Sequence, residues 1–193
     1  MTILQAKNII CSHKGGLRMN LMNLVSGCPV TFATILICAI VYFRQNSDPS
    51  FTGKYLNNSY MIQQGQYYRL LTGGFLHGSP WHIMMNLYSL YNLGPWMERM
   101  LGPAKFLLLL YGGVLIGNLF CYFFKVRSSL GLSGGLYAVM FFYFMLLTSY
   151  TTVSWASILQ NNIANIIINF MPGVAWQAHL GGALFGVLMS FLF

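Results

Sequence analysis

Long apolar runs separated by polar stretches recur along the whole chain. Runs of this length and composition are typical of helices that cross a membrane. The pattern predicts spans at about 29–43, 80–94, 104–124, 131–149, 153–170 and 174–193. An open sheet is excluded because lipid cannot satisfy its edge groups, and a barrel is disfavoured because the runs are long and do not alternate. We therefore predict an all-α polytopic membrane protein, built as a compact bundle of six transmembrane helices.

Two polar stretches and one mixed run complete the expected organisation. Residues 1–28 form a polar N-terminal segment without the features of a signal peptide. Residues 44–79 form a long connection whose aromatic side chains suit the headgroup region of a bilayer. The run at 153–170 must turn one face inward or toward water, because it is rich in amides. These amides are Gln160, Asn161, Asn162, Asn165 and Asn169.

The composition agrees with a membrane protein and excludes several kinds of chemistry. Only 6% of the residues are charged, whereas a soluble domain carries about a quarter. The net charge of +8 comes from basic residues that lie singly between apolar runs, which indicates lipid headgroups rather than nucleic acid as partners. Asp48 and Glu98 are the two acids, too few for a paired-carboxylate hydrolase or an oxygen-ligated metal site. The four cysteines form no CxxC pair, so neither a metal knuckle nor a redox motif is indicated. We expect no metal and no cofactor.

The basic residues do not decide the orientation of the bundle. With six spans, five lysines and arginines fall on each side of the membrane. We expect the N-terminus to be cytosolic.

Three histidines, His77, His82 and His179, lie in or beside the predicted spans. Polar groups at such depth are costly and are candidates for function, although a single buried histidine is more often simply hydrogen-bonded across helices. His82 and Asn86 are four residues apart and therefore share one face of a helix. Both can donate hydrogen bonds into the bundle, but the set lacks the acid or cysteine expected of a zinc site.

Ser133 and His179 both lie among small residues, in GLSGG and AHLGG. Taken alone, Ser133 is most simply a helix-packing residue, because small residues four apart let helix backbones approach closely. The same approach would bring the Ser133 hydroxyl to the His179 imidazole, the base that a serine nucleophile needs. No acid is available to orient that base, so we predict a two-residue arrangement with Tyr137 stacked on the imidazole. His82, Asn86 and the free N–H groups around Ser133 would donate to an oxyanion.

Together these motifs resemble the rhomboid intramembrane serine proteases. HxxxN at His82 and Asn86 comes first, GLSGGLYA around Ser133 follows, and AHLGG at His179 comes last, which is the order of that family.

Further positions extend the resemblance over about residues 65–187. The HxxxxHxxxN spacing that begins at His77 matches, and so does the Glu98–Arg99 pair followed by Gly102.

The resemblance implies a cofactor-independent endopeptidase that cleaves transmembrane segments of single-pass membrane proteins within lipid. It implies that Ser133 is the nucleophile, that His179 is the general base, and that His82, Asn86 and the Ser133 backbone form the oxyanion hole. The supporting residues that it implies are Gly131, Tyr137, His77, Gly182 and Gly186. It also implies a cytosolic N-terminus, a site open toward the outer face, and one six-helix rhomboid protease domain over 29–193 with a membrane-embedded first loop at about 44–79.

Some features depart from the family or favour other functions. Tyr68–Arg69 stands where the family often has Trp-Arg, and the amide-rich run at 153–170 is unusual.

The alternative function is that of a non-catalytic rhomboid-like protein that binds membrane clients, but such relatives typically lack the serine or histidine present here. A small channel or transporter would not need the serine, the base and the donors together. Asn57 begins an N-glycosylation sequon, and the sequence leaves the oligomeric state open.

Overall fold

The computed structural model describes residues 27–171 and 173–193, so the N-terminal segment expected at 1–28 lies almost wholly outside the described residues. The long helices of the described chain are α3 (Pro29–Ser47), α7 (Pro80–Leu101), α8 (Pro103–Phe123), α9 (Ser133–Tyr150) and α12 (Trp176–Leu192). Helices α3, α7 and α8 each begin at a proline, whose fixed φ suits the first helical turn. Of these helices, α3, α8 and α9 are long and apolar enough to cross a membrane, and α12 is a shorter apolar helix.

The run at 153–170 differs from the continuous helix that its sequence predicts. It forms α10 (Trp155–Asn161), α11 (Ile163–Ile167) and the short 3₁₀ helix η2 (Ile168–Phe170). Asn162 ends α10, and its side-chain amide donates to the Ile158 carbonyl at 2.9 Å. Asparagine competes in this way with the backbone bonds of a helix. The predicted count of six transmembrane helices is therefore not confirmed.

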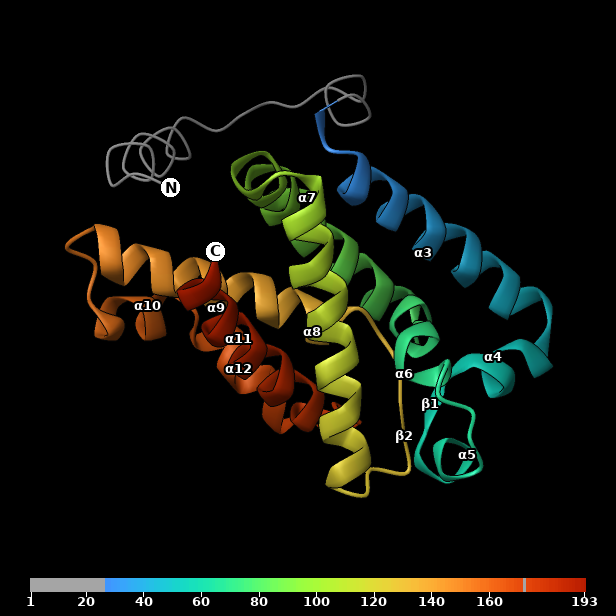
Figure 1. Cartoon of the computed structure of the whole chain (residues 1–193). Coiled ribbons are helices and arrows are strands. Elements are labelled where there is room, and N and C mark those ends of the chain that lie inside the picture. Colours follow the sequence, from blue (N-terminus) through green and yellow to red (C-terminus); the bar gives the residue numbers. More distant parts are fainter. Residues whose placement is uncertain (1–26, 172) are drawn as a thin grey trace.

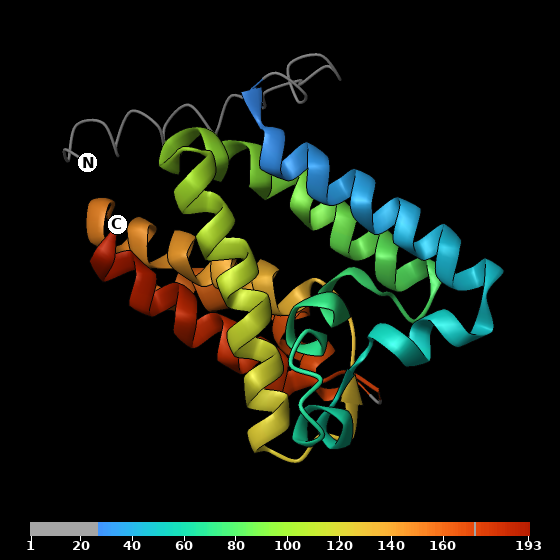
Figure 2. The same ribbon diagram turned by 45° about the vertical axis from the view of Figure 1, so that its right-hand side comes forward.

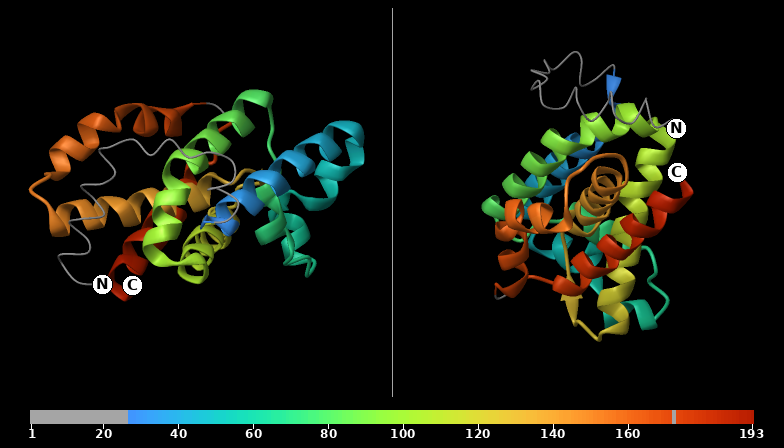
Figure 3. Two further views of the ribbon diagram at one scale, coloured as in Figure 1. Left: turned by 90° about the horizontal axis from the view of Figure 1, so that it is seen from above. Right: turned by 90° about the vertical axis from the view of Figure 1, so that its left-hand side faces the viewer.

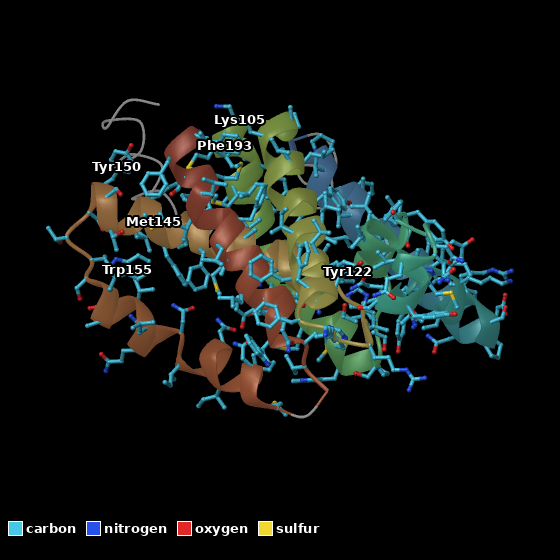
Figure 4. All side chains as sticks on the ribbon, turned by 60° about the horizontal axis from the view of Figure 1, so that its bottom comes forward. Lys105, Tyr122, Met145, Tyr150, Trp155 and Phe193 are labelled. Atoms are coloured by element: carbon cyan, nitrogen blue, oxygen red, sulfur yellow. The ribbon has the colours of Figure 1, made fainter. Side chains whose placement is uncertain are left out.

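The long helices form two pairs with α8 between them (Figure 2). Helix α3 runs along α7, and α9 runs along α12, with the C-terminus of the chain at the end of α12 (Figure 1). At that end Lys105 of α8 and Phe193 lie side by side (Figure 4), with the ammonium 5.1 Å from the ring centroid. The core between α7, α8, α9 and α12 includes Leu90, Met97, Phe106, Leu109, Leu110, Val139, Phe142 and Met189.

Glycines set the spacing of α8, α9 and α12. A Cβ at position 182 would overlap the Gly134 carbonyl oxygen, and one at 186 would overlap the Ala138 carbonyl oxygen. A Cβ at 117 would likewise meet the backbone of Ala178. The small residues therefore permit backbone-to-backbone packing, as expected for helices that associate in lipid by van der Waals contact.

The first loop is a folded unit rather than an irregular connection. Its elements are α4 (Pro49–Tyr55), β1 (Asn57–Asn58), α5 (Ser59–Gln63), α6 (Arg69–Thr72) and the 3₁₀ helix η1 (Gly73–Phe75). The buried Arg69 guanidinium holds these together, because it donates to the Gly53 and Leu56 carbonyls at 2.9 and 3.0 Å and to the Gln66 side chain at 2.7 Å. The cation that the sequence shows at Tyr68–Arg69 thus organises the loop.

A two-residue antiparallel ladder, which the sequence did not predict, joins this loop to the segment before α9. Strand β1 pairs with β2 (Ser128–Ser129), with Asn57 opposite Ser129. Behind the ladder, the Asn57 amide donates to Ser129 Oγ at 2.8 Å, and Ser129 Oγ donates to Asn118 Oδ1 at 3.1 Å. Asn57 is fully buried, so a glycan on its sequon does not fit this fold.

Glu98 of α7 is hydrogen-bonded to the start of α3. Its carboxylate is buried and accepts hydrogen bonds from the Val30 and Thr31 backbone N–H groups, each at 2.8 Å, and from the Thr31 hydroxyl at 2.7 Å. The first N–H groups of a helix have no partner within the helix and carry partial positive charge. The carboxylate therefore satisfies the start of α3 from a neighbouring helix.

Candidate active site

Ser133 and His179 come together where α9 begins against α12. Ser133 is the first residue of α9, and its Oγ lies 2.8 Å from His179 Nε2. His179 lies in the first turn of α12 and is 7% exposed. The contact depends on the close backbone packing of the two helices at Gly182 and Gly134. A hydroxyl in hydrogen-bond contact with an imidazole nitrogen is the arrangement of a serine nucleophile with its base.

Two further side chains fix the His179 ring. The Tyr137 ring stacks on it, with centroids 4.1 Å apart and planes within 6°. The Asn169 Oδ1 atom lies 2.6 Å from His179 Nδ1. Because an amide oxygen only accepts, Nδ1 carries the proton and Nε2 is left to accept from Ser133. The ring is therefore held in the tautomer that a general base requires.

His82 is placed at the start of α7 by a capped helix terminus. Ser79 Oγ accepts from the His82 backbone N–H at 3.1 Å. The Gly78 backbone N–H donates to His82 Nδ1 at 3.4 Å. The neutral ring then carries its proton on Nε2 and is a donor there. A Cβ at position 131 would touch that nitrogen, so the donor lies directly against Gly131, two residues before Ser133.

Asn86 lies one helical turn after His82 and is 5% exposed. Its amide nitrogen donates one hydrogen to the His82 carbonyl at 2.8 Å, which leaves the second for a ligand. Its Oδ1 has no partner among the described residues. The side chain therefore has hydrogen-bonding capacity left unused.

Gly131 shapes the segment that leads into α9. Its φ of +118° lies in a region that residues with a Cβ rarely adopt, and a Cβ would also collide with His82. Its N–H donates to the Gly73 carbonyl at 2.9 Å, so the first loop supports the turn before Ser133.

A cavity of about 580 Å³ connects these groups. Ser133, His179, His82 and Asn86 all line it, and its wall also contains residues 128–131 of the segment before α9. A second cavity of about 500 Å³ shares Tyr137 and His179 with the first and is lined by α9, α12 and the segment 155–171. Figure 3 shows this segment as an arch beside α9, and Figure 4 shows Trp155 at its start, near Met145 of α9.

His77 does not line the cavity but contacts His82, which does. Its ring meets that of His82 edge to face, with centroids 5.1 Å apart, and its Nδ1–H donates to the Phe75 carbonyl at 3.2 Å. The Gln45 side chain of α3 binds both the N–H and the carbonyl of His77, at 3.1 and 2.6 Å. Burial, helped by the neighbouring His82, lowers the pKa of His77 to about 4. His77 is therefore neutral at physiological pH.

The structure thus brings all the candidate residues of the sequence into one region. Ser133, His179, His82, Asn86, Gly131 and Tyr137 line one cavity. His77 contacts His82, and Gly182 and Gly186 set the helix spacing. Asn169 is the residue that sequence reasoning missed. The amide-rich run is evident in the sequence, but no local pattern indicates which of its amides reaches His179. Among the described residues, no three His, Cys, Asp or Glu side chains gather where they could hold a metal ion.

Comparison with known families agrees with this geometry. A family profile described as Rhomboid domain matches residues 64–193, more than half of the chain. The chain belongs to the rhomboid family. With its apolar helices, this rhomboid chain is an integral, multi-pass membrane protein.

Individual relatives include both active and inactive members by name. The rhomboid protein YdcA of Bacillus subtilis is 30% identical over 138 residues, which cover 68% of this chain and 69% of YdcA. Rhomboid protease GluP of the same species is 30% identical over 131 residues, 65% of this chain and 26% of GluP. Inactive RHOMBOID-like protein 8 of Arabidopsis thaliana is 28% identical over 132 residues, 63% of this chain and 37% of that protein. Membership of the family therefore does not by itself decide whether a chain is active.

Proposed function

We propose that this protein is an intramembrane serine endopeptidase that cleaves transmembrane segments of single-pass membrane proteins. Ser133 is the nucleophile and His179 the general base. The observation that carries the proposal is the 2.8 Å contact between Ser133 Oγ and His179 Nε2 inside a membrane-helix bundle. A non-catalytic client-binding protein has no need of this contact.

The reaction follows from these two groups. As Ser133 Oγ attacks the substrate carbonyl carbon, its proton passes to His179 Nε2. The tetrahedral intermediate collapses, the peptide C–N bond breaks, and the departing amine takes the proton from His179. Water, deprotonated by His179, then attacks the acyl-enzyme ester, and the released Ser133 oxygen recovers the proton.

The developing oxyanion has three donors. We assign His82 Nε2–H, the second hydrogen of the Asn86 amide and the Ser133 backbone N–H, which has no intrahelical partner because it lies in the first turn of α9. Donors of this kind, fixed before the reaction, lower the barrier because they need no reorganisation.

The remaining residues position this machinery. Tyr137 stacks on the base, His77 supports His82, and Gly131 brings the His82 donor close to the nucleophile. Gly182 and Gly186 allow α12 to approach α9. Each acts on the geometry rather than on the reacting atoms.

Substrate and water must both reach Ser133. The cavity of about 580 Å³ provides room for water beside the nucleophile. A transmembrane helix already uses its backbone groups in internal hydrogen bonds, so it must unwind locally before a peptide bond can enter. We further propose that the N-terminus is cytosolic and that the cavity opens toward the outer face.

Labelling by a fluorophosphonate tests the proposal in detergent-solubilised protein. We expect the native chain to be labelled, and Ser133→Ala and His179→Ala to lose labelling while keeping native helical circular dichroism. Ser190→Ala, a serine on α12 that bonds the Val187 carbonyl, is the matched control and should label normally. Absence of labelling in well-folded native protein would instead favour the client-binding function.

The oxyanion assignment has a test of its own. His82→Ala and Asn86→Ala should each lower the rate of cleavage of a transmembrane peptide by about tenfold to a thousandfold, the range for a lost oxyanion donor. Cleavage by Ser133→Ala protein would refute the whole mechanism.

A further inference from the structure

Asn169 contacts the base of the site although it lies in a different part of the fold. It belongs to η2, at the end of the segment 155–171, ten residues before His179. Its Oδ1 lies 2.6 Å from His179 Nδ1, on the side of the ring opposite to Ser133. Ser133, His179 and Asn169 therefore form one continuous hydrogen-bonded chain.

The orientation of the Asn169 amide is determined by its other contacts. Its nitrogen donates to the Tyr137 hydroxyl at 2.9 Å and to the Asn165 carbonyl at 2.8 Å. A carbonyl only accepts, so the amide nitrogen must face Asn165 and the oxygen must face His179. The Tyr137 hydroxyl, in turn, donates to the same Asn165 carbonyl at 2.7 Å.

No carboxylate is available for the same task. The two acids of the chain, Asp48 and Glu98, cap the start of α4 and bind the start of α3, respectively. The titratable groups that face His179 are Tyr137 from α9 and His82 from α7. A neutral amide can fix the tautomer and the direction of an imidazole, as an asparagine does in cysteine proteases of the Cys-His-Asn type.

We propose that Asn169 is a positioning residue of the active site, which holds His179 with its proton on Nδ1 and its Nε2 directed at Ser133. The inference rests on the proposed serine-protease function. It makes the site a Ser–His–Asn chain rather than a two-residue arrangement. It also gives the amide-rich run at 153–170 a function, because this run places the Asn169 acceptor beside His179.

Three variants separate this role from a purely structural one. Asn169→Leu removes both the acceptor and the donor. Asn169→Asp keeps an acceptor for His179 but loses the donor that binds Tyr137 and Asn165. Asn161→Leu, the same substitution at an exposed position of the same segment, is the matched control.

The readout is the kinetics of fluorophosphonate labelling as a function of probe concentration and pH, in full-length detergent-solubilised protein. We expect Asn169→Leu to lower the maximal labelling rate by about tenfold to a hundredfold, as for one lost hydrogen bond to a catalytic group, without changing the half-saturating concentration. Asn169→Asp should recover most of this rate at pH 8. Its acid limb should move to higher pH by about one unit or more, because a carboxylate stabilises the imidazolium. Asn161→Leu should behave as the native chain.

The outcomes distinguish the two proposals. If native protein labels, Ser133→Ala does not, and Asn169→Leu labels at the native rate, the role of Asn169 is refuted while the protease function stands. If Asn169→Asp is as impaired as Asn169→Leu and its pH profile is unshifted, the donor contacts matter and the positioning role is again refuted. If well-folded native protein is not labelled, the proposed function itself fails.

Discussion

Two regions of the molecule are held together by different forces. In the close-packed region, formed by α8, α9 and α12, backbone lies against backbone at Gly117, Gly182 and Gly186. In the polar region, formed by α3, the first loop and α7, buried or partly buried polar side chains bind backbone groups. Glu98 binds the start of α3, Arg69 binds two loop carbonyls, and Gln45 binds the backbone of His77.

The difference follows from the backbone of each region. Continuous helices satisfy their own N–H and C=O groups, so they need only close contact to associate in lipid. A folded loop and a helix start leave backbone groups unpaired, and burying these without partners is costly. Side chains must therefore supply the partners. The Ser133–His179 contact lies in the close-packed region, whereas the polar region holds the donors His82 and Asn86.

The largest effect is expected from Gly182→Ala. The added Cβ overlaps the Gly134 carbonyl, so α12 must move away from α9. We expect a loss of about 3 kcal/mol or more in unfolding free energy and loss of fluorophosphonate labelling, because overpacking against backbone has no flexible atom to relax. Thermal unfolding in detergent measures the first effect.

The control for this change is Gly53→Ala in α4, where nothing lies within 4 Å of the added Cβ. It should keep the native midpoint and labelling. Native labelling by Gly182→Ala protein would show that the close approach of α9 and α12 is not needed.

Glu98→Ala tests the polar region. It leaves two N–H groups and the Thr31 hydroxyl without their acceptor, which we expect to lower the unfolding free energy by about 2 to 3 kcal/mol. The labelling rate of the folded fraction should be unchanged, because Glu98 does not line the cavity. Asp48→Ala, at the other acid of the chain, should have a smaller effect, because it removes only the N-cap of the short helix α4. Equal effects of the two changes would contradict the role assigned to Glu98.

The lowered pKa of His77 predicts that the stability of the polar region depends on pH. Its pKa is about 4 in the fold and about 6.5 in an unfolded chain, so the unfolded state binds the extra proton between these values. Stability from this group is thus full above pH 6.5 and falls as the pH decreases toward 4, by about 2 kcal/mol at pH 5. The change in unfolding midpoint between pH 7 and pH 5 should be smaller in His77→Phe than in the native chain. Identical changes would contradict the prediction.

The smallest effect is expected from Tyr111→Phe, at the contact between α3 and α8. The Tyr111 hydroxyl lies 2.8 Å from Thr34 Oγ1, which also donates to the Val30 carbonyl at 2.7 Å and keeps that partner in the variant. We expect a loss of about 0.6 kcal/mol, the average for a hydrogen bond between membrane helices. Tyr88→Phe, at an exposed tyrosine, is the control for unfolding measurements. A loss above about 2 kcal/mol would mean that this single bond carries more of the α3–α8 contact than average.

Much of the fold and of the candidate site could be predicted from the sequence. The apolar runs predict all five long helices of the described chain, because hydropathy over one span is a local property. Their ends were less accurate: α3 continues to Ser47 and α7 to Leu101, past Pro95. The i, i+4 spacing places His82 and Asn86 on one helix face, and the small residues around Ser133 and His179 predict close helix packing.

Only the tertiary structure decided which distant polar groups meet. The run at 153–170 has the apolar content of a span, yet its asparagines compete with helical hydrogen bonds, and it breaks into short helices. The path of the broken segment, rather than any local pattern, carries Asn169 to His179. Asn57 is a surface sequon by motif but is buried because β1 pairs with β2, which lies 72 residues away at Ser129. Local sequence patterns therefore determined the long helices and the residues on each helix face. The partners of buried polar groups depended instead on contacts between separate segments, which only the tertiary structure determines.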